Sequence, residues 1–121
     1  MGIVKPKPKK RVGPNLTLRF HQKEYDLRPG RPAITMGRGP HNDIVVLDEK
    51  VSTKEHGRCD FRENGVVIVD WSANGTYVTK NNGHQVFLHK DALFLTGSGT
   101  ISLGRKPGKS NNVIYYSLEM E

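Results

Sequence analysis

The chain has 121 residues, a formal net charge of +7 and one cysteine, Cys59. This length suits a single domain, and no apolar run approaches the roughly 20 residues that a membrane-spanning helix needs. One cysteine cannot form an internal disulfide, and the first residues lack the apolar stretch of a secretory signal. We therefore expect a protein of a reducing compartment, the cytoplasm or, in a eukaryote, the nucleus.

The positive charge is concentrated at the N-terminus. Residues 1–12 contain five basic residues and no acidic one, whereas residues 13–104 contain 11 basic and 10 acidic residues. We expect residues 1–13 to form an extended Lys/Pro-rich arm or linker, because proline removes backbone donors and neighbouring lysines repel one another. Residues 14–119 then form one nearly neutral domain, and this near neutrality argues against a nucleic-acid-binding surface.

Alternating apolar and polar residues predict β-strands from residue 16 onward. Leu16, Leu18 and Phe20 alternate with polar side chains, and a second alternating run ends at Leu27 after a hairpin loop at 21–23. Turn signals such as Asn-Gly separate the later runs, and no ten-residue window has a helical period. Further strands are expected at 33–36, 43–46, 57–62, 66–70, 76–79, 85–88, 92–95, 100–103 and 113–118, about eleven in all. This pattern predicts an all-β sandwich or barrel.

Several segments resemble functional sites without meeting their requirements. The run from Gly104 to Ser110 is similar to a phosphate-binding P-loop, but it has three residues between its glycines instead of four and precedes a strand. We expect a flexible loop there, and a hairpin turn at 97–99. The five histidines have no metal-ligand spacing, so no metal or cofactor site is expected. No nucleophile motif accompanies Asp70, Asp91 or Glu55, which we expect to be turn and surface residues rather than catalytic ones.

One ordered set of motifs does stand out. Gly37-Arg38-Gly39 ends a predicted strand, and the set continues with Asp43-Ile44, Ser52-Thr53-Lys54-Glu55-His56, Asn74-Gly75-Thr76, Leu95-Thr96-Gly97 and Thr100-Ile101-Ser102-Leu103-Gly104. In this order the motifs resemble the forkhead-associated (FHA) domain, over about residues 16–118. The resemblance implies a twisted, largely antiparallel β-sandwich of eleven strands, of the FHA/SMAD type, that binds phosphothreonine peptides through loops at one end.

The residue types of this set suit the recognition of a phosphate. A phosphothreonine carries a charge of roughly −1.5 to −2 and three acceptor oxygens. Arg38, between two glycines, can present a planar guanidinium that donates two parallel hydrogen bonds. Ser52 and Thr53 each offer a hydroxyl group to the phosphate. The residue three before His56, where the family has a serine, is Thr53. A count forward through residues 48–51 instead gives Ser52 as the equivalent of that serine. Lys54 can add a charge contact.

The remaining site residues are expected either to bind the main chain of the peptide or to support the loops. Asn74 can bind the main chain of a peptide, because its amide both donates and accepts. The resemblance implies that Gly37, His56, Gly75 and Thr76 support the site, with His56 in an architectural rather than a catalytic role. Trp71 and Tyr77 are expected to be packing residues, although Trp71 is close enough to the loops to line the peptide groove. Peptide selectivity is expected to depend on His41, Lys54, Lys80 and Asn81.

The predicted function is a non-catalytic phosphothreonine-dependent interaction module. The resemblance is to FHA domains of bacterial signalling proteins linked to Ser/Thr kinases, including those attached to nucleotide cyclases, so the parent protein can be an enzyme although this module is not. The module is expected to be monomeric within a longer chain and to bind no membrane. Two alternatives remain: a phospho-independent docking or oligomerisation domain, and a basic β-sandwich that binds nucleic acid.

Overall fold

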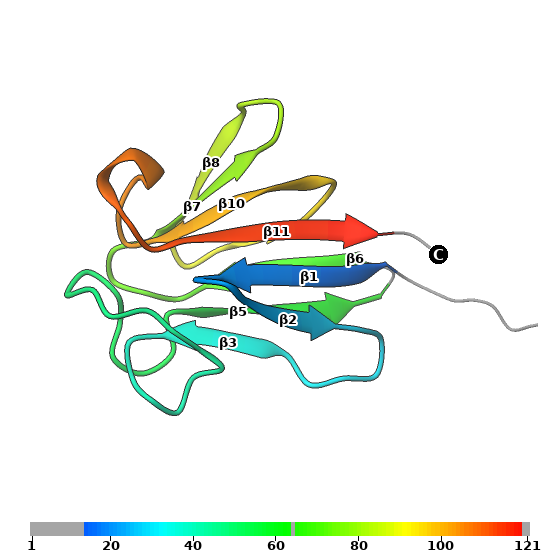
Figure 1. The fold of residues 1–121 in the computed structure, drawn as a ribbon, viewed down its shortest axis with the longest axis horizontal. Coiled ribbons are helices and arrows are strands. Elements are labelled where there is room, and N and C mark those ends of the chain that lie inside the picture. The colour runs from blue at the N-terminus through cyan, green and yellow to red at the C-terminus, as the bar shows by residue number, and fades with distance from the viewer. Residues whose placement is uncertain (1–13, 64, 120–121) are drawn as a thin grey trace, which may run out of the picture.

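The computed structural model describes residues 14–63 and 65–119. In this part of the chain eleven strands form two stacked sheets (Figure 1). The strands are β1 (Asn15–Phe20), β2 (Lys23–Leu27), β3 (Ile34–Gly37), β4 (Ile44–Val45), β5 (Gly57–Arg62), β6 (Gly65–Asp70), β7 (Thr76–Lys80), β8 (Gln85–Leu88), β9 (Ala92–Phe94), β10 (Ser98–Leu103) and β11 (Val113–Glu119). The predicted all-β sandwich of eleven strands is confirmed. The arm expected at residues 1–13 lies outside the described residues.

The sheets differ in their strand pairing. One has six strands in the order β2-β1-β11-β10-β7-β8, and all of its pairs are antiparallel. The other has five strands in the order β4-β3-β5-β6-β9, and its only parallel pair joins β3 to β4. No helix among the described residues is long and apolar enough to cross a membrane.

The core lies between the two sheets and follows the period-two pattern of the strands. Leu16 and Leu18 of β1 are fully buried, while Arg19 between Leu18 and Phe20 is exposed. Side chains of both sheets complete the core, among them Ile34, Met36, Cys59, Ile68, Val78, Ile101, Leu103, Ile114 and Tyr116. Burial of this apolar surface is the main force that holds the sheets together.

Two expected turns are shorter than predicted. His21 and Gln22 alone connect β1 to β2, with positive φ angles of 50° and 71°, and Lys23 already belongs to β2. A two-residue turn of this kind matches the twist of a hairpin. Ser98 and Gly99, expected in a turn, instead begin β10 and pair with Ser117 and Tyr116.

The loop expected at residues 104–110 is present and contains a short 3₁₀ turn at Pro107–Lys109. The arginine of this loop, Arg105, donates from Nε to Asp48 over 2.8 Å. This ion pair joins the loop to the segment between β4 and β5, at one end of the sandwich.

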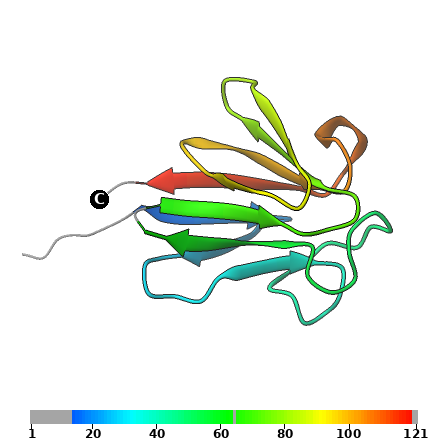
Figure 2. The same ribbon diagram turned by 180° about the vertical axis from the view of Figure 1, so that it is seen from behind.

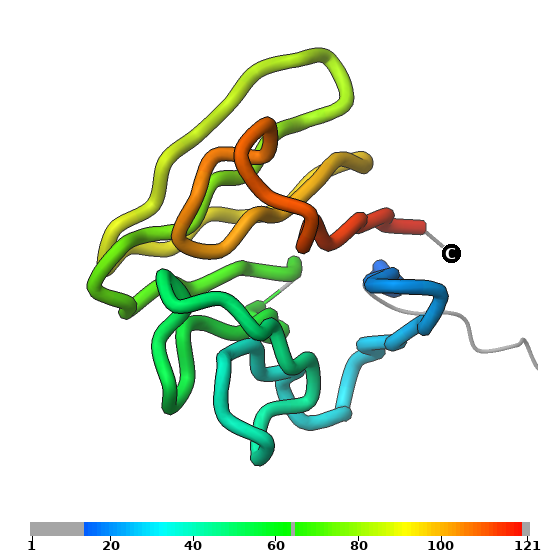
Figure 3. The backbone as a smooth tube through the Cα atoms, turned by 60° about the vertical axis from the view of Figure 1, so that its left-hand side comes forward, coloured from blue at the N-terminus to red at the C-terminus, as the bar shows by residue number. Residues whose placement is uncertain are grey.

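That end carries the long loops of both sheets. In Figure 1 the segment from β3 to β5 and the loop before β11 lie at the end of the sandwich opposite the arrowhead of β11. The view from behind shows β6 running toward the same end (Figure 2), and Figure 3 brings this end forward. The loops therefore meet around the predicted site.

Candidate functional site

Backbone hydrogen bonds join the loop after β3 to the loop before β5. The N–H of Arg38 donates to the carbonyl of Ser52 over 2.8 Å, and the N–H of Gly39 donates to that of Thr53 over 2.7 Å. A strand-like pairing thus continues beyond β3 without a regular strand. It places the Arg38 side chain beside the two hydroxyl residues.

This close approach explains why glycine flanks Arg38. A Cβ atom on Gly37 would contact the carbonyl oxygen of Lys54, and one on Gly39 would contact the carbonyl oxygen of Thr53. Neither glycine has a positive φ angle, so the lack of a side chain matters here through space rather than through backbone conformation. The predicted supporting role of Gly37 fits this packing.

Asn42 is a supporting residue that the sequence did not reveal. It is buried, and its Nδ2 donates to the carbonyls of Gly39 (3.0 Å) and Lys54 (2.6 Å). One amide therefore holds the loop after β3 against the loop before β5. The only sequence signal was an Asn in a polar turn four residues after Arg38, which is typical of many turns.

The Arg38 guanidinium is held at one edge and open at the other. Its Nε donates to the carbonyl of Val51 (3.0 Å) and its Nη2 to Oγ1 of Thr53 (2.7 Å). These bonds use two of the five N–H donors of an arginine, so three have no partner among the described residues. Thr53 is exposed and directly contacts Arg38, whereas Ser52 is half-buried beside it.

His56 joins the loop before β5 to the loop after β6. Its ring is fully buried, Nδ1 accepts the N–H of Ser52 (3.1 Å), and Nε2 lies 2.8 Å from the carbonyl oxygen of Gly75. Because Nδ1 accepts, we assign the ring proton to Nε2, which donates to Gly75. Burial lowers the pKa of His56, and the Gly75 carbonyl and Asp70 only partly oppose this effect. A neutral imidazole therefore spans the two loops.

Asp70 is a buried acceptor, and the expectation that it is a surface or turn residue is wrong. Its Oδ1 accepts from the hydroxyls of Ser72 and Thr76, at 2.7 Å each, and its Oδ2 accepts from the backbone of Lys90 (2.8 Å) and of Ser72 (3.2 Å). Burial of a carboxylate is tolerated only where such donors surround it. The network fixes the turn that contains Asn74.

The Asn74 turn is fixed from both sides. The Ser72 hydroxyl accepts the N–H of Gly75 (2.7 Å), and Gly75 has a φ of 86°, which a residue with a Cβ rarely adopts. Asn74 then donates from Nδ2 to the carbonyl of Lys50 (3.0 Å). Its Oδ1 and its second N–H have no partner in the described part of the chain, so they can bind a peptide main chain.

The predicted binding residues lie together. Arg38, Ser52, Thr53, Lys54 and Asn74 line one open depression of about 460 Å³, and its other lining residues are Glu49, Lys50, Val51, Glu55, Trp71 and Ala73. The structure thus brings together residues from three loops that are up to 36 positions apart, from Arg38 to Asn74. Lys50 and Glu49 were not predicted, because no motif singles them out.

The charge of the depression favours an anion. Both of its acidic residues form salt bridges with arginines outside its lining: Glu55 with Arg58 (2.7 Å) and Glu49 with Arg105 (3.7 Å). The three cations of the lining, Arg38, Lys50 and Lys54, form no salt bridge within the described residues. An incoming anion therefore meets basic side chains that no carboxylate neutralises.

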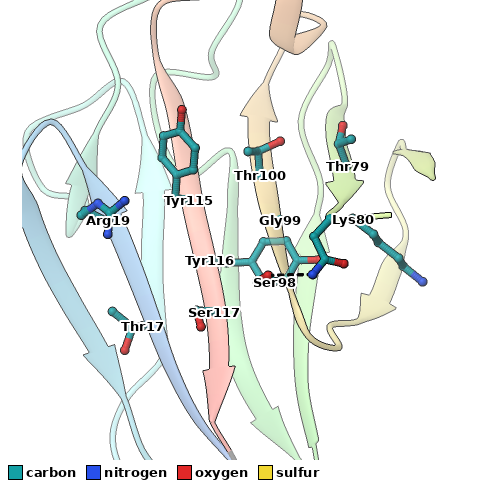
Figure 4. A pocket seen from close by; sticks show the side chains of 11 residues that line it. Thr17, Arg19, Thr79, Lys80, Ser98, Gly99, Thr100, Tyr115, Tyr116 and Ser117 are labelled. Atoms are coloured by element: carbon teal, nitrogen blue, oxygen red, sulfur yellow. Dashed lines mark hydrogen bonds between the residues drawn. The ribbon is translucent and has the colours of Figure 1, made fainter. Parts of the chain in front are cut away.

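Two residues expected near the site lie elsewhere. Lys80 and Asn81 are at the end of β7 remote from Thr76, and they line a second depression of about 410 Å³ on the outer face of the six-stranded sheet (Figure 4). Neither lines the depression around Arg38. They lie away from it because β7 separates them from Thr76, which follows the Asn74 turn at the other end of this strand.

Comparisons with known proteins agree with this architecture. The sequence model of the FHA domain matches residues 34–96, which is just over half of the chain. A search of curated protein sequences gave no match.

Solved structures show the same fold over nearly the whole chain. The Mycobacterium tuberculosis Rv1747 FHA-1 domain is 21% identical with a TM-score of 0.69, over 90% of this chain and 100% of that one. The FHA domain of an Arabidopsis thaliana hypothetical protein is 26% identical with a TM-score of 0.67, over 97% and 94%. The N-terminal FHA domain of Saccharomyces cerevisiae Rad53p, solved with a phosphothreonine peptide, is 18% identical with a TM-score of 0.62, over 88% and 93%. The family match, which includes the loops around Arg38, His56 and Asn74, shows that the chain belongs to the FHA domain family.

Proposed function

We propose that this domain is a non-catalytic module that binds phosphothreonine peptides at the depression around Arg38. The observation that carries the proposal is the Arg38 guanidinium, which is held by Val51 and Thr53. Within residues 14–63 and 65–119, three of its donors have no partner, and the two lysines beside it in the depression form no salt bridge. A doubly charged phosphate with three acceptor oxygens matches these donors. The phosphothreonine peptide bound by the Rad53p domain supports the same ligand class.

Each predicted residue has a role in this proposal. Arg38 and Thr53 contact the phosphate, with Ser52 as the second hydroxyl and Lys54 as a charge contact. Asn74 binds the peptide main chain through its free amide groups. Thr53 is preferred to Ser52 because it is exposed and already touches Arg38.

The supporting roles are those of Gly37, His56, Gly75 and Thr76. Gly37 permits the loops to approach, His56 joins them, and Gly75 and Thr76 complete the turn that presents Asn74. None of the four lines the depression.

Removal of the Arg38 side chain tests the proposal. Binding of a library of phosphothreonine peptides is measured for the wild type, Arg38→Ala and Arg38→Lys, with the exposed Arg62→Ala as the control for loss of a surface charge. A hydrogen bond to a charged group contributes about 1.5–3 kcal/mol, so we expect Arg38→Ala to weaken binding by about ten- to a hundredfold. Arg38→Lys keeps the charge without the planar fork and should be intermediate.

The same assay compares phosphorylated with unmodified peptides. Phosphatase treatment should abolish binding, and phosphoserine peptides should bind less well than phosphothreonine peptides. Equal binding of unmodified peptides, or equal affinities of the wild type and Arg38→Ala, would refute the proposal and favour phospho-independent docking.

We further propose that the domain acts as a monomeric module of a longer signalling protein in the bacterial cytoplasm. The compartment follows from the proposed ligand, because a phosphothreonine reader needs a Ser/Thr kinase in the same compartment. Sedimentation of the domain would test the monomer directly.

A further inference from the structure

Trp71 is exposed where its neighbours in the chain are not. It is 44% exposed, whereas Asp70 and Ser72 on either side are each 1% exposed. The expectation that Trp71 is a packing residue is therefore wrong. Asp70 and Ser72 are held inward by their mutual hydrogen bonds, and this fixed backbone directs the intervening side chain outward.

The indole is held in place before any ligand arrives. The Arg58 guanidinium lies 5.3 Å from the ring centroid, a distance typical of a cation–π contact. Glu55 in turn holds Arg58 through two hydrogen bonds, of 2.7 Å to Nε and 3.2 Å to Nη2. The backbone N–H of Trp71 also donates to the carbonyl of His56 (3.2 Å). Because the ring is already positioned, a ligand that contacts it loses little conformational freedom of the protein.

Trp71 lines the same depression as Arg38, Thr53 and Asn74. We propose that Trp71 forms a second contact surface of this site, which takes an apolar side chain flanking the phosphothreonine of the bound peptide. The proposal rests on the proposed function, and it names the ligand class more narrowly: a phosphothreonine peptide with an aliphatic, aromatic or proline residue close to the phosphorylated one.

The ion pair beside the ring favours an apolar rather than an acidic side chain at this position. An acidic residue would be drawn to this position by Arg58, but Glu55 already occupies two donors of that arginine and balances its charge. A half-exposed indole beside a neutralised ion pair gains most by covering its apolar surface. Large aromatic side chains in such positions are among those that contribute most to interfaces.

The test uses the fact that Trp71 is the only tryptophan of the chain. The peptide library has a fixed phosphothreonine and degenerate flanking positions. It contains no Trp or Tyr, because their fluorescence would overlap the emission of Trp71. Peptides are selected from it on the wild type, Trp71→Ala, Trp71→Phe and Phe94→Ala. Phe94 is a matched control, since it is an exposed aromatic (52%) outside the lining of this depression. Peptides selected on the wild type are then labelled, and their affinity is measured by anisotropy while tryptophan emission is recorded.

We expect the wild type to enrich apolar residues at one flanking position. Binding of such a peptide should shift Trp71 emission to shorter wavelength. Trp71→Ala should lose the enrichment and bind the selected peptide about tenfold more weakly, yet still require the phosphate. Trp71→Phe should retain part of the preference, and Phe94→Ala should behave like the wild type.

The outcomes separate this inference from the proposed function. If phosphothreonine peptides bind but the preferences of the wild type and Trp71→Ala are the same and the emission does not change, the inference is overturned and the proposed function stands. If no phosphothreonine peptide binds the wild type, the proposed function fails and this inference fails with it.

Discussion

Replacement of Asp70 by Asn tests whether the buried carboxylate holds the Asn74 turn. The amide has nearly the same shape, but it is neutral and one of its atoms is a donor. Asp70 faces four donors, the two hydroxyls of Ser72 and Thr76 and two backbone N–H groups. We expect the Nδ2 of the variant to face the hydroxyls, because these can rotate to accept, whereas the backbone N–H groups cannot.

The size of the effect follows from these four bonds. A hydrogen bond to a charged group contributes about 1.5–3 kcal/mol and a neutral one about 0.5–1.5 kcal/mol, so each bond weakens by about 1 kcal/mol. A neutral amide is also easier to desolvate than a carboxylate, which offsets part of this loss. We expect the free energy of unfolding to fall by about 2–4 kcal/mol, and Tm by about 10–20 °C.

Urea unfolding of the wild type and Asp70→Asn measures this difference. Asp91→Asn is the matched control, because Asp91 is exposed and its Oδ1 accepts from the N–H of the next residue, Ala92. It should change stability by less than about 0.5 kcal/mol. A loss no larger in Asp70→Asn than in Asp91→Asn would refute the role assigned to the buried carboxylate.

Two further predictions concern buried titratable groups. Burial lowers the pKa of His56, so the stability from its neutral form is complete above about pH 6.5, the unfolded value, and decreases as the pH falls toward the native pKa. Urea midpoints between about pH 8 and about pH 5 should fall more in the wild type than in His56→Gln, and equal slopes would contradict this. Burial raises the pKa of the Cys59 thiol to about 12. A thiol reagent at neutral pH should therefore label Cys59 only as fast as the domain unfolds, and labelling at the rate of a free thiol would show that it is accessible.

The strands could be predicted because their signal is local. Alternation of Leu16, Leu18 and Phe20 with polar residues requires only that one face of a strand be buried, and the structure places these three side chains in the core. Asn-Gly pairs likewise indicate turns through their own backbone preferences. The hairpin boundaries at 21–23 and 97–99 were less accurate, because pairing with a neighbouring strand extends β2 and β10 into residues that favour turns.

The site could be predicted only in part. Arg38, Thr53 and Asn74 belong to motifs that resemble a known family, and they line one depression. Asn42 and Asp70 gave no such signal, because an Asn or Asp at or beyond the end of a strand is usually a solvated turn residue. Their importance depends on donors and acceptors contributed by other loops, such as the carbonyl of Lys54 and the backbone of Lys90.

The sequence alone determined the fold class and the distribution of charge along the chain. One small all-β domain follows from the period of its apolar residues, and most of the charge of +7 lies in residues 1–12, before the first predicted strand. Only the tertiary structure decided which polar groups are buried, such as Asp70 and His56, and which apolar side chains are exposed, such as Trp71. The physical reason is that strand formation depends on neighbouring residues, whereas burial and charge balance depend on loops that meet from distant parts of the chain.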